Sequence, residues 1–328
     1  MERSPATSIW TVTDGHAGNL RQAQALAAAL GGRPHHCTVH PRAPWRWLAP
    51  RRLPLARAGL GNALGRLLDE PPALAIGCGR QAALATRVLR SRGSRAVQIL
   101  DPRLSTRHWD LVIAPEHDGL DGDNVIRLLG SLHPVDDAWL ATARGHFAAL
   151  GTLAQPRTAL LLGGISAHAR FAPAMIDALV ERLHRTVEAE GGCLMVTTSR
   201  RTPDEVVARL RGRLQGKAHV VLNGPGDGGN LYPGMLAWAD RIVCTADSVN
   251  MLSEACATHL PVFVAGIDQV RGRPRRFVDS LLGLGRVRPL DDTLAAFPIT
   301  PLRETARVAA EVRRRLQLDE PRRPATPL

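Results

Sequence analysis

Short apolar runs alternate along this chain with longer segments in which apolar residues recur at the spacing of one helical face. The pattern is clearest from Ala239 to Ala265, where it predicts the strands Arg241–Cys244 and Pro261–Ala265 on either side of a helix at Val249–Thr258. Both strands are short apolar runs, as is typical of a parallel sheet that is covered on both faces. A polar turn, residues 245–248, joins the first strand to the helix.

The same alternation runs through both halves of the chain. In the first half it predicts strands at Ser8–Thr13, Ala73–Ile76, Ala96–Leu100, Leu111–Ala114 and Val125–Arg127. In the second half three further strands precede the stretch described above, at Thr158–Leu162, Cys193–Thr197 and His219–Leu222. Between or after the strands, helices are predicted at Leu20–Leu30, Gln81–Arg92, Asp136–Leu150, Pro173–Glu190, Asp204–Leu214 and Pro233–Ala237. Strands that alternate with helices in this way predict α/β domains with doubly wound parallel sheets.

The length of 328 residues and a hydrophobic content of 45% allow two such domains, each with its own core. We expect the boundary near Gly151–Pro156, which gives Rossmann-like domains at residues 1–152 and 153–300. A last helix, predicted at Pro301–Leu316, lies in a segment of residues 301–318. The polar, proline-rich residues 319–328 predict a disordered tail.

The chain is strongly basic, with a net charge of +12, and Lys217 is its only lysine. This excess favours anionic partners such as phosphorylated ligands, acidic lipid or nucleic acid. The five cysteines are scattered without a CxxC pair, as is typical of reduced, buried thiols in a reducing compartment. The N-terminus lacks a signal-peptide pattern, and no apolar run approaches the ~20 residues that span a bilayer. We therefore expect a cytoplasmic protein that can also lie peripherally at the inner face of the membrane.

Two strand-to-loop junctions of the second half carry residues suited to hold a diphosphate. Gly163 and Gly164 allow a ligand to approach the backbone closely, and Ser166 can donate a hydrogen bond, although a glycine pair is more often only a turn. After the next strand, Ser199 offers a hydroxyl to a diphosphate and Arg200 or Arg201 offers a guanidinium, with Arg200 the first choice. The alternative for this second loop is a solvated helix start.

The third junction is the polar turn before the helix at 249–258. Thr245, Ser248 and Asn250 surround the start of this helix, where unpaired N–H groups and partial positive charge favour a phosphate. Glu254 lies four residues after Asn250 on the same helical face, where its carboxylate could accept hydrogen bonds from ribose hydroxyls. All three junctions follow predicted parallel strands, and open α/β sheets bind ligands at the carboxyl ends of such strands.

Candidate acid–base residues lie at the corresponding junctions of the first half. Asp14 and His16 follow the first strand in the loop DGHAGN, where either could take a proton from an acceptor hydroxyl. The alternative is a turn in which Asp14 is only a capping group. Glu116, in the sequence PEHD, is another candidate base, although such a sequence is as easily a surface turn.

An acid-free segment follows the first loop. Residues 15–68 contain eight arginines and the pair Trp45 and Trp47, so the part from Arg33 to Arg66 suits an anionic membrane surface. The alternative is an ordinary arginine-rich loop. Nucleic acid is disfavoured as a partner, because the chain has no recognition motif and few aromatic residues for stacking. The histidines and cysteine between residues 35 and 40 have no second ligand cluster, so no metal site is expected.

The sequence lacks motifs that several other enzyme classes require, which disfavours assigning the chain to those classes. No GxGxxG follows the first predicted strand, and the sole tyrosine, Tyr232, has leucine rather than lysine four residues later. Lys217 has no P-loop context. The chain therefore does not fit a short-chain reductase, a sugar epimerase of that kind or a P-loop NTPase.

Segments across most of the chain resemble the "elongated mitochondria" fission-protein family. They are TDGHAGNLRQ (13–22), IGCGRQ (76–81), QILDPR (98–103), APEHDG (114–119), LLGGISAH (161–168), TTSRRTP (197–203) and TADSVNMLSEA (245–255). No catalytic activity is carried over from this family, and its named role cannot apply literally in bacteria.

The second half is also similar to the donor-binding half of the MurG-type glycosyltransferases. Residues 161–167 resemble the GGS loop of those enzymes, and residues 245–255 resemble their loop and helix with a ribose-binding glutamate, which falls on Glu254. The resemblance implies a GT-B fold: two facing Rossmann-like domains with parallel sheets, a cleft between them, and a C-terminal helix that returns to the first domain. The chain departs from these enzymes in its first loop, which is less rich in glycine.

The leading hypothesis is a metal-independent GT-B glycosyltransferase that needs no cofactor beyond its donor, a nucleotide-diphosphate sugar that we expect to be UDP-linked. The first alternative is a non-catalytic descendant of this fold that acts as an adaptor at a membrane surface. The second is a nucleotide-sugar epimerase of the GT-B kind, for which Asp101, Glu116 and Asp118 are the candidate acid–base carboxylates.

Overall fold

The computed structural model describes residues 8–32, 34–55, 59–164, 169, 171–217, 219–224 and 229–318. Ser166, parts of the Arg33–Arg66 segment and the predicted tail 319–328 lie outside these residues. The contacts divide the chain into two compact units. Unit 1 comprises residues 1–134 and 304–328, and unit 2 comprises residues 135–303.

Unit 1 is built on a parallel six-stranded sheet with the order β2-β1-β3-β4-β5-β6. Its strands are β1 (Ile9–Thr13), β2 (His35–Thr38), β3 (Leu74–Cys78), β4 (Arg95–Ile99), β5 (Leu111–Pro115) and β6 (Val125–Leu128). Its helices are α1 (Ala17–Ala29), α2 (Trp45–Leu48), α4 (Asn62–Asp69), α5 (Arg80–Arg90), α12 (Thr305–Leu316) and the short 3-10 turns η1 (Thr106–His108) and η2 (Glu116–Asp118).

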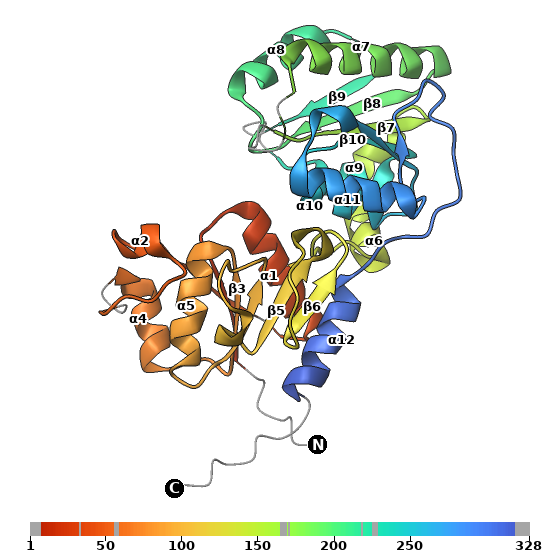
Figure 1. Ribbon diagram of the computed structural model, residues 1–328. Helices are drawn as coiled ribbons and strands as arrows, with labels where there is room; N and C mark the ends of the chain where they lie inside the picture. The colour runs from red at the N-terminus through yellow and green to blue at the C-terminus, as the bar shows by residue number, and fades with distance from the viewer. Residues whose placement is uncertain are drawn as a thin grey trace, which may run out of the picture. The chain divides into compact units, whose positions relative to one another are not determined.

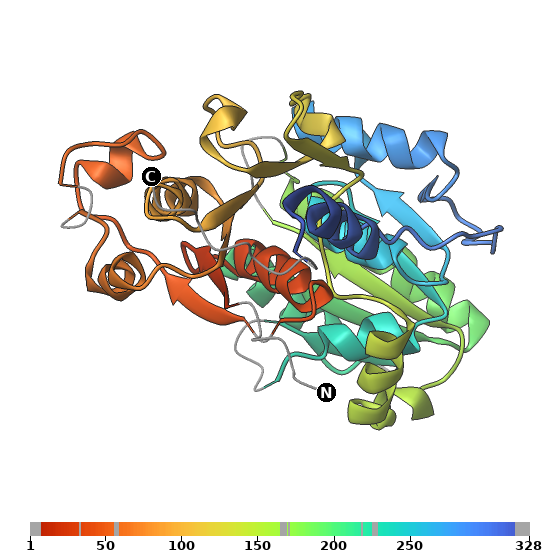
Figure 2. The ribbon, with the colours of Figure 1, turned by 90° about the horizontal axis from the view of Figure 1, so that it is seen from below.

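The helices of unit 1 cover both faces of its sheet. On one face α1 and α12 lie side by side (Figure 2), and Leu26 of α1 and Val312 of α12 are buried in the same core cluster as Ile76 and Ile99. On the other face α4 and α5 bury leucines and alanines against the sheet. The apolar strand sequences predicted a parallel sheet covered by helices on both faces, because neither face of such a sheet is exposed to solvent.

Unit 2 repeats the design with the order β12-β11-β10-β7-β8-β9, again parallel. Its strands are β7 (Arg157–Leu162), β8 (Cys193–Thr198), β9 (Val220–Asn223), β10 (Arg241–Thr245), β11 (Val262–Ala265) and β12 (Arg288–Pro289). Its helices are α6 (Asp137–His146), α7 (Pro173–Glu190), α8 (Asp204–Leu214), α9 (Tyr232–Trp238), α10 (Val249–Cys256), α11 (Gly272–Gly283) and the 3-10 turns η3 (Ala148–Thr152) and η4 (Ile267–Gln269).

One face of the second sheet is covered by α7 and α8, which lie together on one side of the strands (Figure 1), and their leucines share a core with Leu160, Val196 and Phe263. In this order β7 and β10 are neighbours, although 78 residues separate the end of the first from the start of the second. The loops that follow these two strands therefore meet at the topological switch point, where open α/β sheets bind ligands.

The boundary between the units differs from the one expected near Gly151–Pro156. The structure divides the chain at Pro134–Val135, and α6 and η3 belong to unit 2 because they pack against α9. Arg144 donates a hydrogen bond to the carbonyl of Ala237 at 2.8 Å. The last helix, α12, belongs to unit 1, as the GT-B resemblance implies.

Several elements have weaker sequence patterns and were not predicted: α2, α4, α11, β2 and the two-residue β12. No helix among the described residues has the length and apolar character needed to cross a membrane.

Candidate functional site

The loops after β7 and β10 are joined by a buried carboxylate, that of Asp247. It accepts a hydrogen bond from the backbone N–H of Gly164 at 2.8 Å and from the hydroxyl of Thr245 at 2.7 Å. The hydroxyl oxygen of Thr245 in turn accepts the N–H of Gly163 at 2.8 Å. Both backbone N–H groups of the glycine pair are thereby satisfied by side chains of the β10 loop.

Both glycines are required by how closely the loops approach each other. A β-carbon on Gly163 would lie 2.1 Å from a carboxylate oxygen of Asp247, and one on Gly164 would lie 2.3 Å from the backbone of Arg201. No real side chain tolerates such distances, and only glycine lets backbone come this close. The pair Gly163–Gly164 therefore does more than form a turn: it brings three loops into contact.

The third loop follows β8. The hydroxyl of Thr202 donates to the carbonyl of Gly163 at 2.6 Å, and the oxygen of Ser199 accepts the N–H of Arg201 at 3.1 Å. The guanidinium of Arg201 lies 3.7 Å from Asp247 and is about half exposed, at 48%. Arg200, which the sequence favoured, has an exposed side chain.

Burial raises the pKa of Asp247 above its ordinary value. Hydrogen bonds from Thr245 and Gly164 and the charge of Arg201 counteract part of this effect without cancelling it. A carboxylate whose side chain is fully buried is stable only with such partners, so the three loops and Asp247 hold one another in place.

The helix α10 begins at this junction. Ser248 is its N-cap and accepts the N–H of Met251, and Asn250 lies in the first turn with a half-buried side chain. Glu254, one turn further on, is buried and accepts a hydrogen bond from the hydroxyl of Tyr232 in α9 at 2.5 Å. The predicted ribose-binding carboxylate is thus held by the only tyrosine of the chain.

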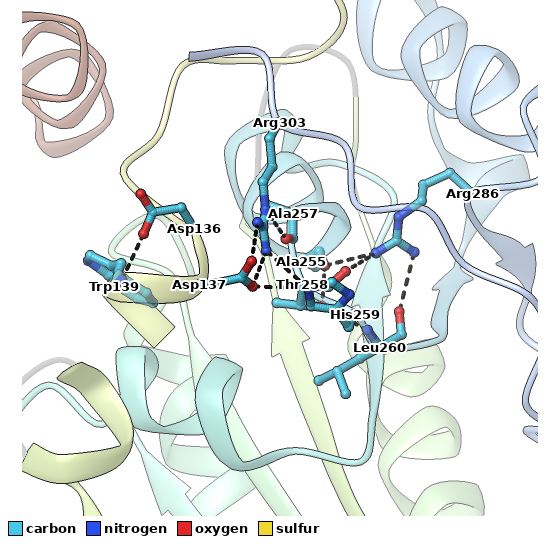
Figure 3. Close-up of polar contacts among 10 residues, drawn as sticks. All are labelled: Asp136, Asp137, Trp139, Ala255, Ala257, Thr258, His259, Leu260, Arg286 and Arg303. Atoms are coloured by element: carbon cyan, nitrogen blue, oxygen red, sulfur yellow. Dashed lines mark hydrogen bonds and ion pairs between the residues drawn. The ribbon is translucent and has the colours of Figure 1, made fainter. Parts of the chain in front are cut away.

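The opposite end of α10 is capped by two arginines (Figure 3). The buried guanidinium of Arg286 donates to the carbonyls of Ala255, Cys256, Thr258 and Leu260 at 2.9 to 3.3 Å. Arg303 donates to the carbonyl of Ala257 at 3.0 Å and forms a bidentate ion pair with Asp137 at 2.7 and 2.8 Å.

These contacts satisfy the carbonyl groups that the last turn of a helix leaves without intrahelical partners. They also place positive charge at the negative end of the helix dipole, so α10 is fastened at its C-terminus while its N-terminus faces the loops of the site.

In unit 1, the predicted base residues lie together after β1. A carboxylate oxygen of Asp14 accepts a hydrogen bond from Asn19 at 2.9 Å and lies 3.1 Å from Nδ1 of His16, whose side chain is 79% exposed. Burial alone would raise the pKa of Asp14, but the hydrogen bonds from Asn19 and His16 outweigh it and hold the pKa below its ordinary value.

The Asp14 loop also meets the loop after β3. Cys78 donates to the side chain of Asn19 at 3.6 Å, and Gly79 has a φ of +92° and no room for a β-carbon beside Asn19. Because β1 lies between β2 and β3, this is the switch point of the first sheet. Glu116 follows β5, two strands beyond β3, and has an exposed side chain. The structure thus brings Asp14 and His16 together but not Glu116 with them.

Asp247, Tyr232 and Asn19 contribute to these sites but were not among the predicted residues. In the sequence, Asp247 is one residue of a polar turn, and Asn19 is an ordinary residue at the start of a predicted helix. Their roles depend on partners in distant loops. Among the described residues, His, Cys, Asp and Glu side chains do not gather in groups of three that could hold a metal ion.

Fold comparison supports the expected fold class. The chain resembles the UDP-GlcNAc 2-epimerase of Neisseria meningitidis bound to UDP-GlcNAc, with a TM-score of 0.59 and 12% identity over 95% of this chain and all of that one. It also resembles the spinosyn forosaminyltransferase SpnP, with a TM-score of 0.50 and 14% identity over 95% of each chain. Two parallel six-stranded α/β sheets and neighbours of this kind confirm a GT-B-like fold.

Comparison with the sequences of known proteins shows which family this chain belongs to. An uncharacterised protein of Rickettsia prowazekii is 24% identical over 95% of this chain and 99% of its own length. The mitochondrial fission protein ELM1 of Arabidopsis thaliana is 32% identical over 280 residues, which are 75% of this chain. The match spans 64% of the length of the plant protein. A family model described as "Mitochondrial fission ELM1" matches residues 17–316, and the chain therefore belongs to the mitochondrial fission ELM1 family.

Proposed function

We propose that this protein binds a nucleotide-diphosphate sugar at the carboxyl edge of the unit 2 sheet and transfers the sugar to an acceptor. The observation that carries the proposal is the junction of the β7 and β10 loops through Asp247, directly before the N-terminus of α10. A helix N-terminus at a switch point is a natural diphosphate site. Because the N–H groups of the glycine pair are already bound by Thr245 and Asp247, the backbone donors for the diphosphate come from the first turn of α10. The fold neighbour bound to UDP-GlcNAc supports a nucleotide sugar as the ligand.

In this proposal the diphosphate lies between the glycine pair and the first turn of α10. Ser248 and Asn250 lie at that turn, and the exposed guanidinium of Arg200 is free to swing toward the ligand. The ribose hydroxyls donate to Glu254, whose carboxylate is positioned by the hydroxyl of Tyr232. The positive end of α10 stabilises the charge that builds on the leaving diphosphate, so the step requires no metal ion.

Transfer also requires a general base for the acceptor hydroxyl, and the loop after β1 offers a candidate. We assign His16 as the general base and Asp14 as the carboxylate that orients its imidazole, since an ionised carboxylate beside Nδ1 stabilises the imidazolium that forms. In the transfer step the base takes the hydroxyl proton, the acceptor oxygen bonds to the anomeric carbon, and the bond from that carbon to the diphosphate breaks. The nucleoside diphosphate leaves with the electron pair.

The test is a thermal-shift and calorimetric titration with UDP-, GDP-, ADP- and CDP-sugars. A ligand at 100 times its dissociation constant stabilises the folded state by ~2.7 kcal/mol, which is readily measured. Asn250→Ala and Arg200→Gln should weaken binding, whereas Arg185→Gln, an exposed arginine of α7, removes the same charge elsewhere in unit 2 and should not.

The outcomes of this titration separate the alternatives. If none of the nucleotide sugars stabilises the folded protein, the proposal is refuted. Binding followed by inversion within the donor sugar, without any acceptor, identifies an epimerase instead of a transferase. If His16→Ala still binds the nucleotide sugar but no longer transfers the sugar, the assignment of His16 as the base is supported.

One observation favours a second function, an adaptor at an anionic membrane surface. Trp47, Leu48 and Leu55 belong to the acid-free segment and expose 64%, 40% and 78% of their surface, and they are three of the four large hydrophobic residues most exposed in the described chain. Apolar side chains among arginines suit the interface of an acidic bilayer. Sedimentation with vesicles of acidic and neutral lipid tests this function, and Trp47→Ser with Leu55→Ser should reduce sedimentation with acidic vesicles only.

A further inference from the structure

The acid-free segment is fastened to α5 by arginines, on the side of unit 1 where α2, α4 and α5 gather (Figure 1). Arg80 donates to the carbonyls of Arg46 and Trp47 at 3.4 Å, and Arg87 donates to the carbonyl of Pro50 at 2.6 Å. These bonds go to backbone atoms, so they fix the path of the segment without neutralising any charge.

A hollow of about 280 Å³ opens where this segment, the end of α5 and η1 come together. It is lined by Arg52 of the segment, by Arg87, Arg90 and Ser91 at the end of α5, and by His108 of η1. Its lining thus comes from three parts of the sequence, and every side chain in it can donate a hydrogen bond.

Positive charge exceeds negative charge around this hollow. Three guanidiniums line it, and the charge of Arg107 acts on the lining residue His108. Among the described residues, Asp110 is the one carboxylate that pairs with any of these four arginines. Asp110 pairs with Arg90 at 3.0 Å, so three positive charges have no carboxylate partner among the contacts of the described residues.

Structural roles account for some of these groups but not for all. Arg87 lies over the ring of Trp109 at 5.9 Å, and Arg87 and Arg90 also lie in the last turn of α5, where the helix dipole favours cations. Arg52 has no such role: it forms no hydrogen bond or ion pair with any residue that the structure describes. Nothing in the packing of the described chain requires a fourth cation here.

The crowding affects the titration of the lining groups. Burial lowers the pKa of His108, and the charges of Arg87, Arg107, Arg90 and Arg52 lower it further. Burial and the charge of Arg52 also lower the pKa of Arg87. A bound anion would relieve this repulsion, and proteins concentrate like charges in this way mostly at functional sites.

We propose that this hollow is a binding site for a phosphate group. Its volume is below the range of sites that enclose a whole cofactor, but it accommodates a phosphate with part of the molecule that carries it. Guanidinium groups match the geometry of phosphate oxygens, and the hydroxyl of Ser91 and the imidazole of His108 add further donors. The phosphate can be that of a lipid headgroup or of a soluble ester, and the two sources share this chemistry.

The test compares two variants that lose the same charge. Arg52→Gln removes the guanidinium that lacks a partner, and Arg66→Gln removes an exposed one on α4. With inorganic phosphate at fixed ionic strength, calorimetry should show affinity about tenfold lower for Arg52→Gln, as for the loss of one charge-assisted hydrogen bond. Arg66→Gln should change the affinity by less than about twofold, since solvent and salt screen its charge.

The source of the phosphate is then decided with vesicles. Binding to phosphatidylcholine vesicles that contain phosphatidic acid, lost in Arg52→Gln and kept in Arg66→Gln, assigns a lipid headgroup. Binding of inorganic phosphate with no preference for phosphatidic acid assigns a soluble ester. Either result supports the site.

Two results would overturn the proposal. Equal weakening in both variants would mean that anions respond only to the net charge of the protein. Unchanged phosphate affinity in Arg52→Gln would place the anion elsewhere, for example at the loops of unit 2. Stabilisation by nucleotide sugars should be the same in wild type and Arg52→Gln, so the test does not depend on the proposed transferase function.

Discussion

The carboxylate of Asp247 occupies the space that a side chain at position 163 would need. A β-carbon on Gly163 would lie 2.1 Å from its Oδ2 atom, and the N–H of Gly164 is bound to that same oxygen. The glycine pair and the aspartate are therefore one structural unit, although they lie in the loops that follow two different strands, β7 and β10.

Gly163→Ala should destabilise unit 2 and abolish stabilisation by nucleotide sugars. The added methyl group must displace a buried carboxylate and break its bonds to Gly164 and Thr245, which we expect to cost ~2–4 kcal/mol. Gly212→Ala in α8 is the matched control, since its β-carbon meets nothing within 4 Å. It should be neutral or stabilise by up to ~1 kcal/mol. Chemical denaturation measures both, and similar effects of the two substitutions would contradict the role given to Gly163.

Asp247→Asn should change how stability depends on pH. Because burial raises the pKa of Asp247, the folded protein binds a proton there more tightly than the unfolded chain does. The contribution of Asp247 is therefore largest below the ordinary value of 3.8 and is lost as the pH rises through the folded pKa. Asparagine does not titrate, so the stability of the variant does not fall with rising pH for this reason.

Denaturation of both proteins between about pH 3 and pH 7 measures the effect. The stability of wild type relative to Asp247→Asn should fall as the pH rises, and a parallel pair of curves would refute the raised pKa.

Arg286→Met should be among the most damaging single substitutions in unit 2. It removes the guanidinium that donates to the carbonyls of residues 255, 256, 258 and 260, and it leaves an apolar side chain among these polar groups. We expect a loss of ~3–5 kcal/mol. Arg286→Lys should rescue little, because an ammonium group lacks the planar fork that reaches several carbonyls at once. Arg92→Met, at an exposed position, should change the free energy of unfolding by less than ~0.5 kcal/mol.

Tyr232→Phe should weaken nucleotide-sugar binding as well as folding. The substitution keeps the ring and removes the hydroxyl that donates to Glu254, so the buried carboxylate loses one partner and its fixed orientation. We expect a loss of ~1–3 kcal/mol in folding, together with a fall in donor affinity. Calorimetry on protein that is still folded measures the affinity, and an unchanged affinity would remove Glu254 from the proposed ribose site.

Anion binding at the arginine hollow should strengthen as the pH falls. His108 faces Arg87 and Arg90 on α5, Arg52 on the neighbouring segment, and Arg107 and Asp110 in its own stretch of chain. Its pKa is low in the free protein, and a bound dianion raises it, so binding takes up a proton.

Sulfate is the suitable probe, because it stays a dianion where phosphate titrates. Its affinity should be higher at about pH 6 than at about pH 8 in wild type, with the slope reduced in His108→Gln. Equal slopes in the two proteins would show that His108 does not take up the proton.

Elements with strong local patterns are predictable from the amino-acid sequence. The helices α7 and α8 begin and end where predicted, at Pro173–Glu190 and Asp204–Leu214. Of the twelve strands in the part of the chain that the structure describes, ten were expected within a few residues of their observed bounds. These patterns are local: the apolar spacing of one strand or a few helical turns determines which face can be buried. The exposed helix α2 and the short strand β12 lack such a pattern and were missed.

The tertiary structure alone decided which loops meet. That β10 lies beside β7 is a matter of long-range strand pairing, and only this pairing brings Asp247 to the glycine pair. The same holds for Tyr232 and Glu254, for Arg286 at the end of α10, and for the arginines of the hollow. Each of these polar groups was visible in the sequence, but a buried polar group takes its role from the partner that satisfies it, and that partner lies in another part of the chain.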